Sequence, residues 1–393
     1  MMACSSPLAR PTMKQGLAFA LLIVVIIGGY SVGLRVIAGV AWPTAVWQGA
    51  VCALAAGPIL IALIGTLSIP KRLARYSIAA YRAVSPLMAA YQYAFPWVIW
   101  SLMILWMNAG RILGGRAWLA GAAITLFSYG CGAALVLLLR PRSSDIEITR
   151  VEIAIPNLPP AFDGYAILQI SDLHAGSHLS RMSTEERLRQ ARELKKDLVV
   201  FTGDLSSRSS YVDSAAAAVA ELGAPDGIVA VLGNHDHWVG EGRVARALAE
   251  HGVTVLANSH LRLSRNGDDI WLVGVQDCSY IRRDDLPRAL DGVPQGATAI
   301  AITHSPDLVS QPEASRLALI LAGHTHGGQM VFPWIGPLYV PTKLGRRRMS
   351  GLLEVNGRQL FITRGLGEVT LPTRLNCPPE LALLTLRRRA PRV

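Results

Sequence analysis

Short blocks of aspartate, asparagine and histidine are the residues of this sequence that could do chemistry. Together they offer seven oxygen or imidazole donors, namely Asp172, His174, Asp204, Asn234, His304, His324 and His326. Carboxylate, amide and imidazole donors without thiolate favour manganese, iron or zinc over softer metals. A carboxylate can bridge two cations, because it has two oxygens and a charge that offsets part of both. These donors therefore predict a site that binds two metal ions side by side and attacks a phosphate ester between them.

The elements that must position these donors are short apolar runs that alternate with helical stretches. Alternating apolar residues from Ile146 to Ile155 predict a first strand. Further runs predict strands at Ala166–Ile170, Leu198–Phe201, Ile228–Leu232, Ile270–Val273, Ala299–Ile302, Leu317–Leu321, Leu360–Ile362 and Leu381–Leu386. Helices are predicted at Thr184–Lys196, Ser214–Leu222 and Gly242–His251. The pattern indicates an α/β domain with buried strands.

Each block of donors follows directly on one of the predicted strands. Asp172 and His174 follow the run that ends at Ile170, for example, and His304 follows the run that ends at Ile302. In α/β sheets, sites form beyond the carboxyl ends of strands. We therefore expect the blocks to converge on one edge of the sheet.

The first part of the chain is apolar and contains no acidic residue between Lys14 and Arg140. Across the whole chain 51% of residues are hydrophobic and only 17% are charged. Four uncharged stretches are long enough to cross about 30 Å of hydrocarbon: Leu17–Leu34, Val36–Pro70, Ala83–Gly110 and Ala117–Leu139. We predict a membrane region of about four transmembrane helices over residues 1–143 and a globular domain over residues 144–393. A cleaved signal peptide is the alternative for the first stretch, and buried helices of a soluble core are the alternative for some of the others.

Basic residues between the apolar stretches predict the orientation of these helices. One side would carry eight of them: Arg10, Lys14, Lys71, Arg72, Arg75, Arg82, Arg140 and Arg142. The opposite side would carry three: Arg35, Arg111 and Arg116. This asymmetry predicts a multi-pass protein of the cell (inner) membrane whose catalytic domain is cytoplasmic. Three or five spans would reverse the side of that domain.

The charge distribution indicates the kind of partner, and the cysteine spacing bears on disulfide formation. The formal charge is +11, but much of the basic excess flanks apolar stretches, so we expect a lipid bilayer as partner and no nucleic acid. No protein partner is indicated. The 5 cysteines are scattered without a CxxC pair, which favours buried or incidental thiols over a disulfide framework.

The blocks of donors occur in the order D-x-H, G-D, G-N-H-D, H and G-H-x-H over roughly Tyr165 to Gln329. This pattern resembles the calcineurin-like metallophosphoesterase superfamily. Gly327-Gly328-Gln329 and the segment Arg374–Glu380 extend the resemblance to bacterial membrane-associated members. The resemblance implies a hydrolase of phosphoesters. It also implies an α/β fold, a four-layer-type β-sandwich flanked by helices and preceded here by the α-helical transmembrane region.

The resemblance also implies a role for each residue of the blocks. One ion would lie on Asp172, His174 and His326, and a second on Asn234, His304 and His324, with Asp204 bridging. His235 would lie over the phosphate as general acid or charge stabiliser, and Asp236 would orient it. The two divalent ions would be manganese, iron or zinc, with manganese favoured. A hydroxide that they share would attack phosphorus in line.

The substrate is indicated less directly. The mostly apolar stretch Met330–Leu344, followed by Arg346-Arg347-Arg348, suggests a loop that contacts the membrane and its anionic headgroups; an ordinary surface loop is the alternative. Arg364 follows a predicted strand and is a candidate phosphate contact. We expect an amphiphilic or lipid-linked phosphoester as substrate, with soluble nucleotides or phosphoesters as the alternative. A membrane-anchored sensor that binds without turnover is the hypothesis from another class.

Overall fold

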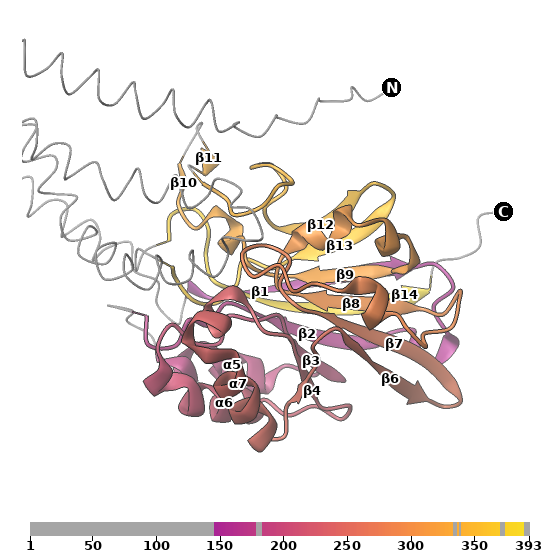
Figure 1. Cartoon of the computed structure of the whole chain (residues 1–393), viewed down its shortest axis with the longest axis horizontal. Coiled ribbons are helices and arrows are strands. Elements are labelled where there is room, and N and C mark those ends of the chain that lie inside the picture. The colour runs from indigo at the N-terminus through magenta and orange to yellow at the C-terminus, as the bar shows by residue number, and fades with distance from the viewer. Residues whose placement is uncertain (1–144, 178–182, 333–335, 338, 370–373, 389–393) are drawn as a thin grey trace, which may run out of the picture. The chain divides into compact units, whose positions relative to one another are not determined.

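The computed structural model describes residues 145–177, 183–332, 336–337, 339–369 and 374–388 (Figure 1). They lie within one compact unit of the chain, Leu139–Val393. The four predicted membrane spans fall outside the described residues, so they stay a prediction. No helix in the described part of the chain has the length and apolar character needed to cross a membrane.

The first of two large sheets has six strands in the order β1-β14-β2-β3-β4-β5. In that order they are Glu147–Ile155, Glu380–Arg388, Ala166–Ile170, Leu198–Phe201, Ile228–Ala230 and Thr254–Val255. β14 is parallel to β1 and antiparallel to β2, whereas β2 to β5 are parallel neighbours. The carboxyl ends of β2, β3 and β4 therefore lie at one edge of this sheet.

The second sheet also has six strands, in the order β12-β13-β9-β8-β7-β6. In that order they are Gly351–Val355, Arg358–Ile362, Leu319–Ala322, Ala299–Thr303, Asp268–Val275 and Ser259–Arg265. β13, β9, β8 and β7 are parallel, and the two edge strands are antiparallel to their neighbours. A small antiparallel pair, β10 (Val331–Phe332) and β11 (Gly336–Pro337), lies between β9 and β12 in the sequence.

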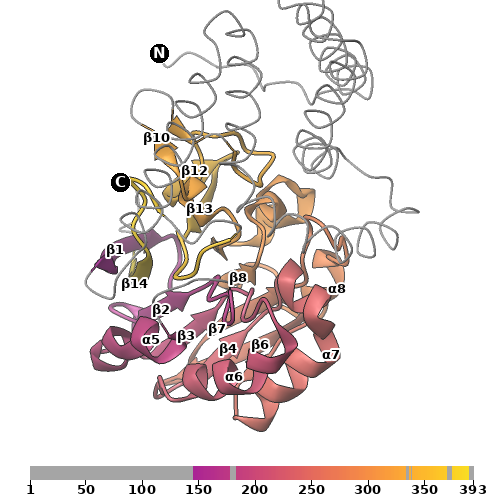
Figure 2. The ribbon, with the colours of Figure 1, turned by 90° about the vertical axis from the view of Figure 1, so that its left-hand side faces the viewer.

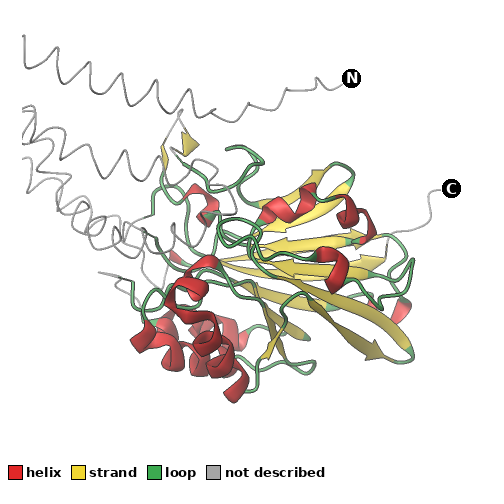
Figure 3. Ribbon diagram, in the orientation of Figure 1, coloured by secondary structure: helices red, strands yellow, loops and turns green. Residues whose placement is uncertain are grey.

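Helices cover the outer faces of the sheets (Figures 2 and 3). Among the described residues the α-helices are α5 (Thr184–Glu193), α6 (Val212–Ala220), α7 (Asn234–Glu250) and α8 (Leu286–Ala289). The 3₁₀ helices are η4 (Pro160–Phe162), η5 (Ser209–Tyr211), η6 (Pro306–Ser310), η7 (Pro312–Arg316) and η8 (His326–Gly328). α5 begins with a capping box, in which Ser183 accepts from the backbone N–H of Glu186 and the Glu186 side chain accepts from that of Ser183.

Three hydrophobic clusters hold the layers together. One joins α5, α6 and α7 to the first sheet, a second fills the space between the sheets, and a third joins α8, η6 and η7 to the second sheet. Strand β3 shows how one segment serves two clusters: Leu198 and Val200 point between the sheets, while Val199 and Phe201 point toward the helices. Apolar residues at every position follow from burial on both faces. The predicted α/β class is confirmed, and both sheets are mixed.

The sequence patterns located the central strands better than the edges. The runs at Ala166–Ile170 and Leu198–Phe201 match β2 and β3 residue for residue, whereas the short or more polar strands β5, β6, β10, β11 and β12 were missed. α7 begins at Asn234, whereas the predicted helix begins at Gly242. The predicted range matches only the part of α7 that follows a break at Gly240, where φ is 128°. The donor blocks were expected to follow the strands of one sheet. They follow strands of two sheets instead: β2, β3 and β4 in the first and β8 and β9 in the second.

Candidate metal centre

The candidate site lies where the carboxyl ends of strands from the two sheets meet. The backbone N–H of His324, after β9, donates to Oδ2 of Asp172, after β2, at 3.1 Å. The Nδ1 of His304, after β8, lies 2.8 Å from the carbonyl oxygen of Thr202, after β3. These bonds link the two sheets and fix the donor blocks against one another.

Asp172, His174 and His326 form one group of donors, here called the His326 group. Nε2 of His326 lies 3.1 Å from Nε2 of His174 and 3.4 Å from Oδ1 of Asp172. The other ring nitrogen of His174 lies 3.2 Å from Oγ of Ser207, so that hydrogen bond fixes which nitrogen faces the group. All three side chains are buried.

Asp204, His304 and His324 form a second group, here called the His304 group. Nε2 of His304 lies 3.0 Å from Nδ1 of His324 and 3.2 Å from Oδ2 of Asp204. Because Nδ1 of His304 donates to Thr202, its Nε2 is the nitrogen directed at the group. These three residues are also buried.

Asp204 belongs to both groups through a single oxygen. Its Oδ2 lies 3.2 Å from Nε2 of His304 and 3.5 Å from Nε2 of His174. Its Oδ1 accepts the backbone N–H of His235 at 2.8 Å. The bridge expected from two carboxylate oxygens is thus arranged differently: one oxygen is held by the backbone, and the other faces both groups.

The donors fit two divalent ions. Two ligands each about 2.1 Å from an ion and at right angles to each other lie about 3 Å apart, close to the separations within each group. Oδ1 of Asp172 and Oδ1 of Asn234 are buried and have no hydrogen-bond partner among the described residues. Buried acceptors without a partner are costly, and cations would satisfy them. The residues of the His326 group would hold one ion, those of the His304 group with Asn234 the other, with Asp204 shared.

The backbone of the site is strained as well as crowded. Left-handed φ values are found at five donor residues: Asp172 (53°), His174 (47°), Asp204 (60°), His324 (70°) and His326 (51°). Such conformations cost on the order of 1 kcal/mol or more each for residues other than glycine, and they persist at functional sites where the surroundings enforce them. Gly233 is needed for a different reason, because a Cβ there would lie 2.2 Å from Oδ1 of Asp204.

The electrostatics differ between the two groups. Burial, reinforced by the charge of Arg374, lowers the pKa of His326 to about 3, and burial with the neighbouring His304 lowers that of His324 to about 4. Burial also opposes a charge on His304, but the adjacent Asp204 carboxylate outweighs it and raises the pKa of His304 to about 10. The Asp204 carboxylate thus favours the protonated form of His304, whereas burial favours the neutral forms of His324 and His326.

His235 and Asp236 lie at the start of α7. His235 is half-buried, with its ring centroid 4.5 Å from that of His174, so it reaches the rim of the His326 group. The carboxylate of Asp236 accepts three backbone N–H groups, those of Asp204, Leu205 and Gly233, at 2.8 to 2.9 Å. Asp236 was expected to orient His235; these bonds indicate that it positions the turn before His235 and the loop that carries Asp204.

The C-terminal segment Arg374–Glu380 supports the His326 group through contacts with the backbone carbonyl of His326. Arg374 is buried and its guanidinium donates to the carbonyl oxygens of Arg364, Gly365 and Gly367 and, at 3.5 Å, of His326. The thiol of Cys377 contacts the carbonyl oxygen of His326 at 3.2 Å. In the sequence, only the family resemblance pointed to this segment. Its role depends on contacts between residues about fifty positions apart, which no local pattern reveals.

The structure also shows where Arg364, Tyr339 and two of the cysteines lie. The guanidinium of Arg364, the candidate phosphate contact, lies 2.7 Å from Glu147 and 3.0 Å from Glu380, so two acids already hold it. Tyr339, in the stretch expected to contact a membrane, is 50% exposed. Cys278 and Cys377 are free, buried thiols, as predicted for those two.

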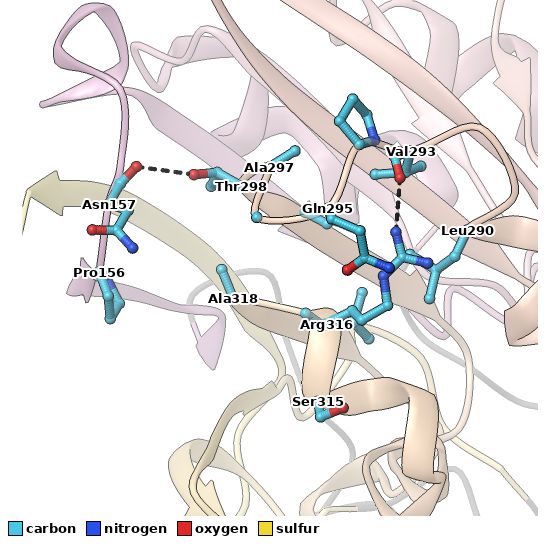
Figure 4. A pocket seen from close by; sticks show the side chains of 14 residues that line it. Pro156, Asn157, Leu290, Val293, Gln295, Ala297, Thr298, Ser315, Arg316 and Ala318 are labelled. Atoms are coloured by element: carbon cyan, nitrogen blue, oxygen red, sulfur yellow. Dashed lines mark hydrogen bonds between the residues drawn. The ribbon is translucent and has the colours of Figure 1, made fainter.

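A pocket of about 310 Å³ lies away from this centre (Figure 4). It is lined by Asn157, Arg316 and residues next to the first positions of β8 and β9, so it lies at the amino ends of strands whose carboxyl ends carry His304 and His324. Thr298 and Arg316 donate there to the backbone carbonyls of Asn157 and Val293. We therefore do not assign this pocket to the metal centre.

Comparisons with known proteins agree with the geometry. The sequence model of the calcineurin-like phosphoesterase family matches residues 165–328. The metallophosphoesterase YkuE of Bacillus subtilis is 30% identical over 274 residues, which cover 68% of this chain and 93% of that protein. The phosphodiesterase YaeI of Escherichia coli is 29% identical over 56% of this chain and 82% of its own length. A transmembrane protein with a metallophosphoesterase domain from Danio rerio is 29% identical over 61% of this chain, which spans 57% of that relative.

Proposed function

Because the chain belongs to the calcineurin-like phosphoesterase family, and is thus a metal-dependent hydrolase of phosphoesters, we propose that it uses two divalent ions, with manganese favoured. The proposed substrate is an amphiphilic phosphoester at a membrane. One observation carries the proposed chemistry. Oδ2 of Asp204 faces nitrogen donors of both groups, at 3.2 and 3.5 Å, so two ions would lie side by side with a carboxylate between them.

Two such ions would supply hydroxide at neutral pH and offset the negative charge of the phosphate. The residues of the chain then have separate tasks. Asp172, His174 and His326 hold one side of the phosphate site, and Asn234, His304 and His324 hold the other. His235 lies at the rim, where it acts on the leaving oxygen as general acid or charge stabiliser, although burial lowers its pKa. The hydroxide that the ions would supply would bond to phosphorus as the opposite P–O bond breaks, with the electron pair of that bond going to the leaving oxygen.

The amphiphilic substrate is supported by the sequence and by the position of one loop. The chain has four apolar stretches before residue 140, and the Danio rerio relative is named as a transmembrane protein. Tyr339 and Arg346–Arg348 are exposed in the segment that follows the last donor, His326. We propose an inner-membrane location with this domain in the cytoplasm, where such a segment can meet anionic headgroups.

The substrate hypothesis is tested with purified full-length chain and Mn²⁺. The panel compares a lipid monophosphate and a lipid pyrophosphate with soluble nucleotides and soluble diesters, with and without mixed micelles. The proposal expects faster turnover of lipid substrates and a gain from micelles. Equal or faster turnover of the soluble esters, without a gain from micelles, would reject it in favour of soluble nucleotides or phosphoesters.

The catalytic role is tested by His235→Ala. Loss of general acid catalysis costs about 10²- to 10⁴-fold in rate, while the metal content should stay at the wild-type level. His251→Ala is the matched control, because His251 lies past the far end of the same helix, 3.5 Å from Asp213, and should leave the rate unchanged. A protein that binds metal and phosphoester but turns over none of the panel would support the sensor hypothesis.

A further inference from the structure

A row of aromatic rings joins the two sides of the metal centre. The ring of Trp238 lies 4.6 Å from that of His235 and 5.8 Å from that of Tyr280, and the ring of Tyr280 lies 5.7 Å from that of His324. Both ends of the row, His235 and His324, are residues of the candidate site. The row therefore borders the side of the site from which His235 would protonate a leaving group.

The two central rings are held in place by the fold. Trp238 is three residues after His235 on α7, so both side chains lie on one face of that helix. Tyr280 lies in a turn after β7, where the buried carboxylate of Asp277 accepts the N–H groups of Ser279, Tyr280 and Ile281 at 3.1 to 3.2 Å. This turn fixes the backbone that presents the Tyr280 ring.

An ion pair links the two elements that carry Trp238 and Tyr280. Glu241, on the second turn of α7, accepts from Arg283, in the loop after β7, at 2.5 Å. The same oxygen of Glu241 lies 2.5 Å from Nδ1 of His237. Because the pair is exposed, it adds little stability, but it links α7 to the loop that follows β7.

The row continues from the buried centre to the protein surface. The hydroxyl of Tyr280 lies 3.0 Å from the hydroxyl of Tyr339, whose side chain is 50% exposed. Trp238 and Tyr280 are themselves only half-buried. Neither ring belongs to any of the three hydrophobic clusters of the described residues, so packing of the core does not account for them.

We propose that Trp238, Tyr280 and Tyr339 form a leaving-group subsite that binds an extended apolar alcohol next to the phosphate. This inference rests on the proposed function of the metal centre and adds a substrate class to it: phosphoesters whose leaving group is an alkyl chain or a comparable apolar body. The subsite acts on single substrate molecules, independently of any membrane surface. Partly exposed aromatic rings give up water readily to an apolar chain, and each methylene that becomes half-buried there raises kcat/KM about twofold.

The test uses n-alkyl phosphates from methyl to hexyl, as monoesters and as the matching methyl diesters, below their micelle concentrations. Their leaving alcohols have nearly the same acidity, so differences in kcat/KM report binding of the chain. Full-length protein in phosphatidylcholine nanodiscs with Mn²⁺ should show a rise of about 30-fold over the five added methylenes. Trp238→Ala and Tyr280→Ala should each reduce this hexyl-to-methyl ratio to about fivefold or less, and Trp238→Phe should retain an intermediate ratio.

Trp271→Leu is the matched control, since Trp271 packs against His260 and the outer cluster of the second sheet, away from the centre. It should leave the ratio at the wild-type value. A flat series in the wild type, or a full ratio in both alanine variants, would overturn the proposed subsite.

The same ratio can be measured without turnover, as the relative affinity of hexylphosphonate and methylphosphonate for the metal-loaded protein. Metal-dependent hydrolysis with no dependence on chain length would refute the subsite and leave the proposed function intact. Absence of hydrolysis with a 30-fold affinity ratio would refute the proposed function and leave the subsite intact.

Discussion

The two groups of donors share Asp204 but differ in what surrounds them. The His326 group is supported by the C-terminal segment, where Arg374 and Cys377 contact the carbonyl oxygen of His326. The His304 group is supported by the bond from His304 to the carbonyl of Thr202, which links the two sheets. Burial lowers the pKa values of His174 and His326 in the first group, whereas the Asp204 carboxylate raises the pKa of His304 in the second. We therefore expect two ions to bind under different control, and only binding at the second group should release a proton from His304.

The largest effect should come from Gly233→Ala, which would damage both groups together. A Cβ at this position would lie 2.2 Å from Oδ1 and 2.7 Å from the backbone nitrogen of Asp204, so the shared carboxylate must move. We expect activity to fall at least about 10³-fold, because displacing a shared ligand removes several kcal/mol of transition-state stabilisation from both ions. Steady-state rates with metal analysis measure this.

Gly242→Ala is the control on the same helix. No heavy atom lies within 4 Å of a Cβ at Gly242, so the substitution should retain activity and stabilise α7 by about 0.5–1 kcal/mol. Full activity in Gly233→Ala would show that the position of Asp204 is less restricted than the structure indicates.

Single substitutions should separate the groups. His326→Ala and His304→Ala each remove one donor of one group and should each leave one ion bound, while the rate falls about 10³-fold. Metal content per chain, measured after dialysis against trace Mn²⁺, distinguishes the outcomes. If either variant lost both ions, the two groups would not be separable sites.

A smaller effect, confined to the His326 group, is expected from Arg374→Met. The substitution removes the guanidinium donor from the carbonyls of Gly365, Gly367 and His326, and loss of such supporting contacts weakens metal affinity about 10- to 100-fold. Titration calorimetry should show weakening of one of two binding events. Arg358→Met is a suitable control, because this arginine donates to Val309 at the other end of the second sheet. Equal weakening of both events would contradict the assignment of Arg374 to one group.

Per unit of pH, the smallest effect is the dependence of metal affinity on pH. The pKa of His304 is raised to about 10, so this ring is protonated at pH 7 and must release its proton to bind an ion through Nε2. One binding event should therefore release about one proton, and its affinity should rise about tenfold per pH unit from pH 7 toward pH 9. The event at the His326 group should lack this contribution, since the pKa of His326 is already lowered to about 3. Calorimetry in buffers of different ionisation enthalpy counts the protons, and two events with equal proton release would remove the distinction.

The donor residues of both groups could be predicted from the sequence, but the difference between the two groups could not. The donor residues and the strands before them follow from short local patterns, such as the run before Asp172. The division of the strands into two sheets depends on pairings between distant segments, such as β14 with β1 and β2, which periodicity does not encode. The contacts of Arg374 and the placement of Trp238 beside Tyr280 likewise depend on the tertiary fold. Trp238 did carry a local signal, since it lies three residues after His235 on one helix.

The central claim is that two ions share Asp204, and metal content per chain tests it most directly. Full-length wild-type protein equilibrated with Mn²⁺ and then desalted should contain two ions per chain by mass spectrometry of the metal. Asp204→Ala, with folding verified by its melting curve, should contain fewer than one, because each group loses a ligand that faces it at 3.2 or 3.5 Å. A wild-type value of one ion per chain, or two ions retained in Asp204→Ala, would contradict the account.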